Sequence, residues 1–130
     1  MQRSDFLLCL CGEEPDALTQ PMPCHRLDAA TGGRVVLAKT RLALRVLNGM
    51  FSDRQVSKEY VAIVEGSLQG RGVCDVPVGG KAASSRWETI LQSESPFHGG
   101  TITTVRLHPS TGRKHQLRLH LKSMGHPILG

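Results

Sequence analysis

The sequence predicts an α+β fold with a mixed, largely antiparallel sheet and flanking helices. Four short runs are rich in β-branched residues, and two longer stretches carry apolar residues at helical spacing. Their order along the chain is strand, helix, strand, strand, strand, helix, which is typical of the α+β class. A chain of 130 residues is long enough to bury a single hydrophobic core.

The first half of the chain contains one predicted strand and one predicted helix. The apolar, β-branched run at 34–39 predicts a strand that is followed directly by Thr40. Thr40 is a good N-cap residue, so a helix is predicted over 41–51. Its apolar residues recur at helical spacing, at Ala43, Leu47, Met50 and Phe51.

The second half contains three predicted strands, at 57–66, 84–92 and 100–109. Segments rich in glycine or containing proline separate them and indicate turns. No strand is predicted between the first and second of these runs.

The last predicted element is a helix that begins after Ser110 or Thr111, either of which is a possible cap. Its apolar positions are Leu117, Leu121 and Met124, and it stops at Gly125 and Pro127. Basic residues spaced by four share a different face of this helix, at Lys114, Arg118 and Lys122. A solvated basic stripe would account for that pattern as well as a binding surface would.

Residues 1–22 are predicted to be a poorly patterned N-terminal lead, and residues 23–130 the folded domain. The lead ends in a Pro-containing stretch, 13–23, that reads as loop. Its apolar run at 6–11 is too short to span a membrane, and no cleavage site of small residues follows it. No membrane association is therefore expected.

The balance of charge favours a polyanionic partner. Sixteen Lys and Arg residues against eleven Asp and Glu residues give a formal net charge of +5 and an isoelectric point near 9.4. Basic patches attract phosphates, so nucleic acid is the simplest partner, although an inert basic surface would give the same composition. Aromatic residues are few, which argues against a broad platform for base stacking.

The cysteines and histidines do not form a recognised metal-binding pattern. A site built from Cys9, Cys11 and Cys24 is conceivable, but no CxxC pair occurs. Free thiols in a reducing intracellular compartment are the better interpretation for the four cysteines. The late histidines are interpreted as packing or RNA-contacting groups; they are His115, His120 and His126.

The stretch PCHRLDAATGGRVVLAK, residues 23–39, places Asp28 beside two basic residues and just before a Thr-Gly-Gly turn. Ordinary turn chemistry explains an aspartate in this position, because Asp favours turns and Gly supplies unusual backbone angles. The alternative is that the turn presents a reactive carboxylate. Composition does not decide between them.

Three stretches favour the reactive carboxylate at Asp28. In this order along the chain they resemble the RluA-like family of RNA pseudouridine synthases. HRLDAATGG (25–33) resembles the family's HRLDxxTSG signature, and KEYVAIVEG (58–66) resembles its KxYxAxVxG strand. HPSTGRKHQLRLHLKSMGHPILG (108–130) resembles its PxTGRxHQLRxHxxxxGHPIxGD block. The resemblance implies the catalytic fold of that family. Because the family's block continues with an Asp after the position of Gly130, the catalytic domain is expected to be truncated at its C-terminal end.

The resemblance also implies the roles of seven residues. Asp28 would be the catalytic carboxylate, and Arg118 would pair with it. Arg26 would help to extrude the target nucleotide or hold its place in the stack. Tyr60 would contact the flipped uracil, and Leu117 would line the base pocket. His25 and Thr31 would fix the shape of the loop that carries Asp28.

The family's reaction isomerises uridine to pseudouridine in rRNA or tRNA and needs neither a cofactor nor a metal. We therefore expect an RNA-modifying isomerase that binds RNA, needs no cofactor and acts as a monomer. Two alternatives stay open: a catalytically silent relative that binds RNA, and a basic module that binds another partner. Asp28, Tyr60 and Arg118 favour the enzyme, because RNA binding alone needs no buried carboxylate.

Overall fold

The computed structural model describes residues 15–95 and 100–130, and these form six strands and two helices. The chain divides into two units, Met1–Gln55 and Val56–Gly130. Every strand pair in the described residues is antiparallel, in a two-stranded and a four-stranded sheet. The predicted α+β class with a largely antiparallel sheet is therefore confirmed.

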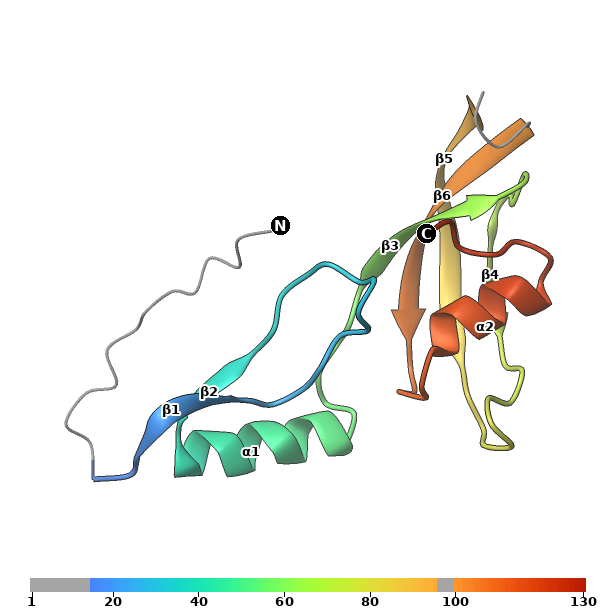
Figure 1. Cartoon of the computed structure of the whole chain (residues 1–130). Coiled ribbons are helices and arrows are strands. Elements are labelled where there is room, and N and C mark those ends of the chain that lie inside the picture. Colours follow the sequence, from blue (N-terminus) through green and yellow to red (C-terminus); the bar gives the residue numbers. More distant parts are fainter. Residues whose placement is uncertain (1–14, 96–99) are drawn as a thin grey trace. The chain divides into compact units, whose positions relative to one another are not determined.

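The first unit is a strand pair with one helix beside it (Figure 1). Strand β1 (Ala17–Pro23) pairs with β2 (Leu37–Thr40), and helix α1 (Arg41–Ser52) follows at once. Thr40 caps the helix as predicted, because its Oγ1 accepts a hydrogen bond from the N–H of Ala43 at 3.0 Å. Asp16 supports the same helix start by accepting the N–H of Leu42 at 2.7 Å.

Two predictions in this unit were wrong in detail. The stretch 13–23 was predicted as loop, yet β1 occupies most of it, because an edge strand tolerates its prolines. The strand predicted over 34–39 begins later, at Leu37, because the preceding residues close a loop instead of pairing with β1.

The second unit is a four-stranded sheet with one helix on one face (Figure 1). Its strand order is β3-β6-β5-β4. The elements are β3 (Tyr60–Glu65), β4 (Arg71–Cys74), β5 (Ser85–Ser95), β6 (Gly100–Pro109) and α2 (Gln116–Ser123).

Strands β3, β5 and β6 lie where the sequence predicted strands, but two details differ. Strand β4 was missed, since its four residues include a glycine and carry almost no pattern. Helix α2 begins at Gln116, well after the predicted caps Ser110 and Thr111. The hydroxyl of Thr111 is bound elsewhere, as described below.

Helix α2 packs against the sheet through one apolar cluster. Its buried members are Val64, Leu68, Val105, Leu107 and Leu121, and half-buried residues surround them, including Tyr60, Leu117 and Met124. The predicted apolar positions of the helix (Leu117, Leu121 and Met124) therefore do face the core. The alternation along β6, where Thr103, Val105 and Leu107 are buried, gives the sheet one covered face.

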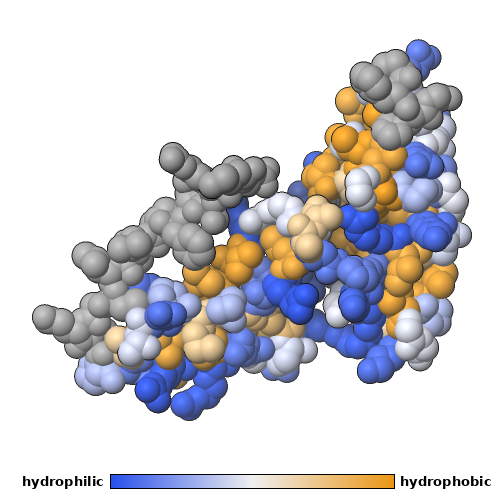
Figure 2. Space-filling view, viewed as in Figure 1, coloured by the Kyte–Doolittle hydropathy of each residue, from blue (hydrophilic) through white to orange (hydrophobic). Residues whose placement is uncertain are grey.

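Apolar residues also reach the surface in both units (Figure 2). Those in the first unit include Met22, Val36, Leu42 and Val46, and those in the second include Val61, Ile63, Val73 and Leu91. Neither α1 nor α2 has the length and hydropathy of a membrane span, and no other helix occurs in residues 15–95 and 100–130.

Candidate active site

The loop that carries Asp28 is closed at its base by two hydrogen bonds. The N–H of Cys24 donates to the carbonyl of Val36 at 2.9 Å. The N–H of Val36 donates in return to Nε2 of His25 at 3.0 Å. The His25 ring also lies against Phe51, with 4.7 Å between the ring centroids. His25 thus joins both ends of the loop to helix α1, in agreement with its expected role in shaping this loop.

Within the loop, Asp28 begins a tight turn. Its carbonyl accepts the N–H of Thr31 at 2.9 Å, the pattern of a four-residue turn. Gly33 follows with φ of 152°, an angle that residues with a side chain rarely adopt. The turn bond involves only the main chain of Asp28, so a turn and a reactive carboxylate are compatible in one residue. Asp28 is half-buried, and Arg26 is exposed.

Tyr60 and Leu117 approach the same core from two elements of the second unit. Tyr60 is the first residue of β3 and pairs with Leu107 of β6. Leu117 is the second residue of α2, and both side chains pack against the cluster around Leu121. Two of the residues that were predicted to surround a uracil therefore pack against one apolar cluster, and their contact with a base stays a prediction.

Arg118, the next residue of α2, is bound to the C-terminal segment of the chain. Its Nη1 donates to the carbonyl of Gly130 at 2.7 Å. This segment runs along β3, where the N–H of Leu129 donates to Ile63 at 2.9 Å and the N–H of Glu65 to Pro127 at 3.0 Å. The bond to Gly130 uses one of the five N–H donors of the guanidinium.

The predicted site residues are divided between the two units. Arg26 and Asp28 belong to the first, and Tyr60, Leu117 and Arg118 to the second. The pairing of Asp28 with Arg118 stays a prediction.

Gln116 is the polar residue of this region that sequence reasoning missed. Its side chain is buried, with 4% exposed, and it forms hydrogen bonds to four groups of the β5 start and the loop before α2. A glutamine at the start of an amphipathic helix normally reads as solvent-facing, so hydropathy gave no signal. Its place between His115 and Leu117 in the third motif was the only pointer.

Two of the late histidines, His120 and His126, bind main-chain carbonyls. His120 is 2% exposed, and its Nε2 lies 2.8 Å from the carbonyl of Val76, to which it donates. Nδ1 of His126 donates likewise to the carbonyl of Glu65 at 2.8 Å. The packing interpretation is confirmed for His120, whereas His126 is half-buried and its contact with RNA stays a prediction.

The described residues offer no cluster of three metal ligands, and Cys24 and Cys74 are buried free thiols. The conceivable ligands Cys9 and Cys11 lie outside the described residues.

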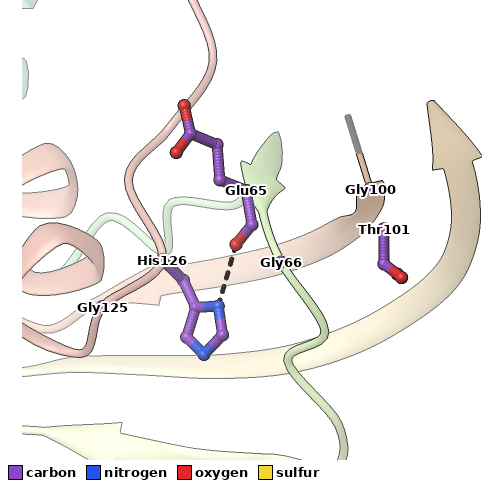
Figure 3. A pocket seen from close by; sticks show the side chains of 6 residues that line it. All are labelled: Glu65, Gly66, Gly100, Thr101, Gly125 and His126. Carbon is purple, nitrogen blue, oxygen red and sulfur yellow. Dashed lines mark hydrogen bonds between the residues drawn. The ribbon is translucent and has the colours of Figure 1, made fainter. Parts of the chain in front are cut away.

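A shallow hollow of about 340 Å³ opens where β3 and β6 meet the segment after α2 (Figure 3). His126, Gly66 and Thr101 are among the residues that line it, with the bond from His126 to Glu65 at its edge. None of the predicted site residues lines this hollow. It also has little apolar surface, so we do not assign it to the candidate site.

Residues 3–123 match the protein family described as RNA pseudouridylate synthase. The match contains the first two motif stretches in full and the third as far as residue 123. The chain belongs to this family. The resemblance that the three motifs predicted is therefore confirmed.

Curated members of the family resemble the chain closely. A dual-specificity RNA pseudouridine synthase RluA of Yersinia pestis is 40% identical over 122 residues, which cover 82% of this chain and 57% of that protein. The tRNA pseudouridine synthase C of Haemophilus ducreyi is 34% identical, and the match covers 83% of this chain and 53% of that protein. The human pseudouridylate synthase RPUSD2 is 36% identical, and the match covers 98% of this chain and 25% of that protein. The chain thus spans about half the length of the first two and a quarter of the third.

Solved structures of the family have the same fold. Human RNA pseudouridylate synthase domain containing 1 superposes with a TM-score of 0.76 at 26% identity, over 84% of this chain and 53% of that chain. Human RNA pseudouridylate synthase domain containing 4 gives a TM-score of 0.69 at 31% identity, over 85% of this chain and 50% of that chain. These similarities confirm the predicted fold.

Proposed function

We propose that this chain isomerises a uridine in structured RNA to pseudouridine, with Asp28 as the catalytic carboxylate. The observation that carries the proposal is the family match over residues 3–123, a range that includes the loop of Asp28, strand β3 and helix α2. Two of the relatives named above are an RNA pseudouridine synthase and a tRNA pseudouridine synthase. We infer the same substrate class here, rRNA or tRNA.

The proposed reaction breaks the bond between N1 of uracil and C1′ of the ribose, turns the base, and forms a bond from C5 to C1′. C5 loses its hydrogen and N1 gains one, so the product has the same mass as the substrate. Asp28 would act either by attacking the sugar or base covalently or by stabilising a glycal-type intermediate. Neither route needs a group donor, a redox partner, a metal or a cofactor.

The basic partner proposed for Asp28 is Arg118. An ionised carboxylate in a water-excluding site needs a compensating charge, and a guanidinium offers two parallel hydrogen bonds. The bond of Arg118 to Gly130 is compatible with this role, because it uses only one of the five N–H donors of the guanidinium.

Tyr60, Leu117 and Arg26 are proposed to receive the target nucleotide. A base inside a stack is out of reach, so it must flip out at a cost of a few kcal/mol. Tyr60 and Leu117 pack against one core cluster and would form the wall for the flipped uracil. Arg26 is exposed on the loop of Asp28 and would occupy the gap in the stack.

The RNA backbone is proposed to bind basic residues around α2. Lys114 and Lys122 are exposed and Arg113 is half-buried, and the chain carries a net charge of +5. Residues 23–130, together with strand β1 that pairs with β2, would form the catalytic part, acting as a monomer. The buried free thiols of Cys24 and Cys74 support a reducing compartment.

The test is to incubate the full chain with tRNA and rRNA and to map pseudouridine by chemical labelling of the freed N1 position. We expect one or a few uridines to convert, and RNA affinity to fall as salt rises from low to physiological concentration. A chain that binds RNA but converts no uridine would contradict the proposal and favour the catalytically silent relative. A chain that neither binds nor converts RNA would favour a basic module that binds another partner.

A variant sharpens the test. Tyr60→Phe keeps the ring that packs against the core, so the fold should persist. We expect RNA affinity to stay near that of the wild type, because most affinity comes from phosphate contacts. A Tyr60→Phe chain that no longer binds RNA would assign Tyr60 to docking instead of base contact.

A further inference from the structure

Gln116 uses the full hydrogen-bonding capacity of its side chain although it is buried. Oε1 accepts from Oγ1 of Thr111 at 2.7 Å and from the N–H of Arg113 at 3.0 Å. Nε2 donates to the carbonyl of Ser84 at 2.9 Å and to Oγ of Ser85 at 2.8 Å. A glutamine has two acceptor lone pairs and two donor hydrogens, so all four are satisfied. Such a network specifies one geometry, because any shift leaves a buried polar group without a partner.

The network ties the loop 110–115 to the start of strand β5. The N–H of Ser84 donates to Oγ1 of Thr111 at 3.0 Å, and the N–H of Ser110 donates to the carbonyl of Ser84 at 3.0 Å. Nε of Arg113 donates to the carbonyl of Ala82 at 3.1 Å. Gln116 lies at the centre of these bonds, since it binds both sides of the junction.

The same residue begins helix α2, whose start has no ordinary cap. The N-cap residue His115 has φ of 54°, in the left-handed region, and makes no side-chain cap hydrogen bond. The N–H of Gln116 donates to the carbonyl of Arg113 at 3.1 Å, and Oε1 of Gln116 accepts the N–H of Arg113, so Gln116 itself fixes the turn that leads into the helix. Leu117 and Arg118 are the next two residues, so their places depend on where this turn begins.

We propose that Gln116 is a positioning residue of the reaction: it locks the start of α2 to β5 and thereby places Leu117 and Arg118. This role rests on the proposed function. Gln116 touches no reacting atom and acts only through the two residues that follow it. A misplacement of about 1 Å in a group that positions substrate costs roughly 100-fold in rate.

The test compares Gln116→Met with Gln116→Glu and a matched control. Methionine keeps the length of the side chain and removes all four bonds. Glutamate keeps the acceptor for Thr111 and Arg113 but has no N–H for Ser84 and Ser85. The control is Gln92→Met, because half-buried Gln92 also lies in the second unit and binds Ser67 at 2.9 Å and Gln69 at 3.4 Å.

Pseudouridine formation is measured with the full chain, at a temperature at which circular dichroism shows each variant to be folded. We expect kcat of Gln116→Met to be about 100-fold lower than that of the wild type, with KM for RNA nearly unchanged. The kcat of Gln116→Glu should lie between those of Gln116→Met and the wild type. Gln92→Met should have the kcat of the wild type. A second readout needs no activity: the amide hydrogen of Arg113 should exchange faster in Gln116→Met.

Two results would overturn this role while leaving the proposed function intact. One is a folded Gln116→Met chain with wild-type kcat. The other is unchanged exchange at Arg113, which would mean that Gln116 does not anchor the loop. A wild-type chain without activity on any RNA would instead overturn the proposed function and this role with it.

Discussion

The two units hold their parts of the proposed site by different means. In the first unit the only buried apolar residues in the described range are Cys24 and Ala38, and helix α1 has no buried residue. The loop of Asp28 is fixed there mainly by hydrogen bonds: the N–H groups of Cys24 and Thr31 donate to carbonyls of the loop, and Nε2 of His25 accepts the N–H of Val36. In the second unit Tyr60 and Leu117 rest on a continuous apolar core.

This difference has consequences for stability and function. A core contributes free energy in proportion to the apolar area that it removes from water, whereas a single hydrogen bond contributes only about 1 kcal/mol net. Core substitutions in the second unit should therefore be costly, and changes in the first unit should cost little stability even where they alter the loop of Asp28. The following predictions test this contrast, from the largest expected effect to the smallest.

Leu121→Ala should cause the largest loss of stability. Leu121 is 1% exposed in the core of the second unit, so truncation should lower the free energy of unfolding by about 2–5 kcal/mol. Leu119→Ala is the matched control in the same helix, since Leu119 is 45% exposed and should change stability by about 0.5 kcal/mol or less. Urea denaturation followed by circular dichroism measures both. Equal losses would mean that this core does not hold the helix.

Replacing a glycine by alanine should change the free energy of unfolding in opposite directions in the two units. Gly66 directly follows β3 with φ of 80°, and an added Cβ would lie 3.2 Å from Nδ1 of His126. Gly66→Ala should therefore lower the free energy of unfolding by about 1–3 kcal/mol, the usual cost of a residue in a strained backbone region. Gly49 lies in helix α1 with nothing within 4 Å of an added Cβ. Gly49→Ala should raise stability by about 0.5–1 kcal/mol.

Thermal melts of the two alanine variants against the wild type decide this prediction. A Gly66→Ala chain that is more stable than the wild type would show that the His126 ring moves away from the added Cβ at no cost. A destabilised Gly49→Ala chain would show that this face of α1 is covered in solution.

Thr40→Ala tests whether the first unit depends on local hydrogen bonds. Removing the N-cap oxygen should lower the free energy of unfolding of α1 by about 1 kcal/mol. Thr40→Ser keeps the hydroxyl and should retain most of that stability. Hydrogen exchange at Ala43, whose N–H binds Thr40, reports the effect locally. Equally fast exchange in the serine and alanine variants would contradict the cap.

Elements with a strong local pattern were predicted well from the sequence. The helix after Thr40 and strand β6 match their predicted ranges closely, because cap chemistry and β-branched runs act locally. Strand β1 was missed because its prolines argue against a strand and its residues are mostly exposed, so no alternation marks it. The start of α2 was misplaced because Thr111 binds Gln116 and Ser84 across the junction with β5.

The candidate site was predictable only where a motif marks it. Asp28, Tyr60 and Arg118 were found because they lie in ordered stretches that resemble a family. Gln116 lies in one of those stretches, but its importance depends on contacts with residues about 30 positions away. Such long-range bonds leave no period in the sequence, so only the structure reveals them.

The most direct test of the central claim is single-turnover release of tritium from RNA labelled at C5 of uridine. Wild-type chain, Asp28→Asn and Asp53→Asn are compared on the same RNA. Asp53 is an exposed aspartate at the end of α1, so its variant controls for the loss of one carboxylate in the first unit.

Asp28→Asn is nearly isosteric, so the fold and RNA binding should persist in that variant. We expect release by Asp28→Asn to fall below detection, because an amide cannot replace a carboxylate in covalent or electrostatic catalysis. Asp53→Asn should match the wild type. Equal release by Asp28→Asn and the wild type would contradict the claim and reduce Asp28 to a turn residue.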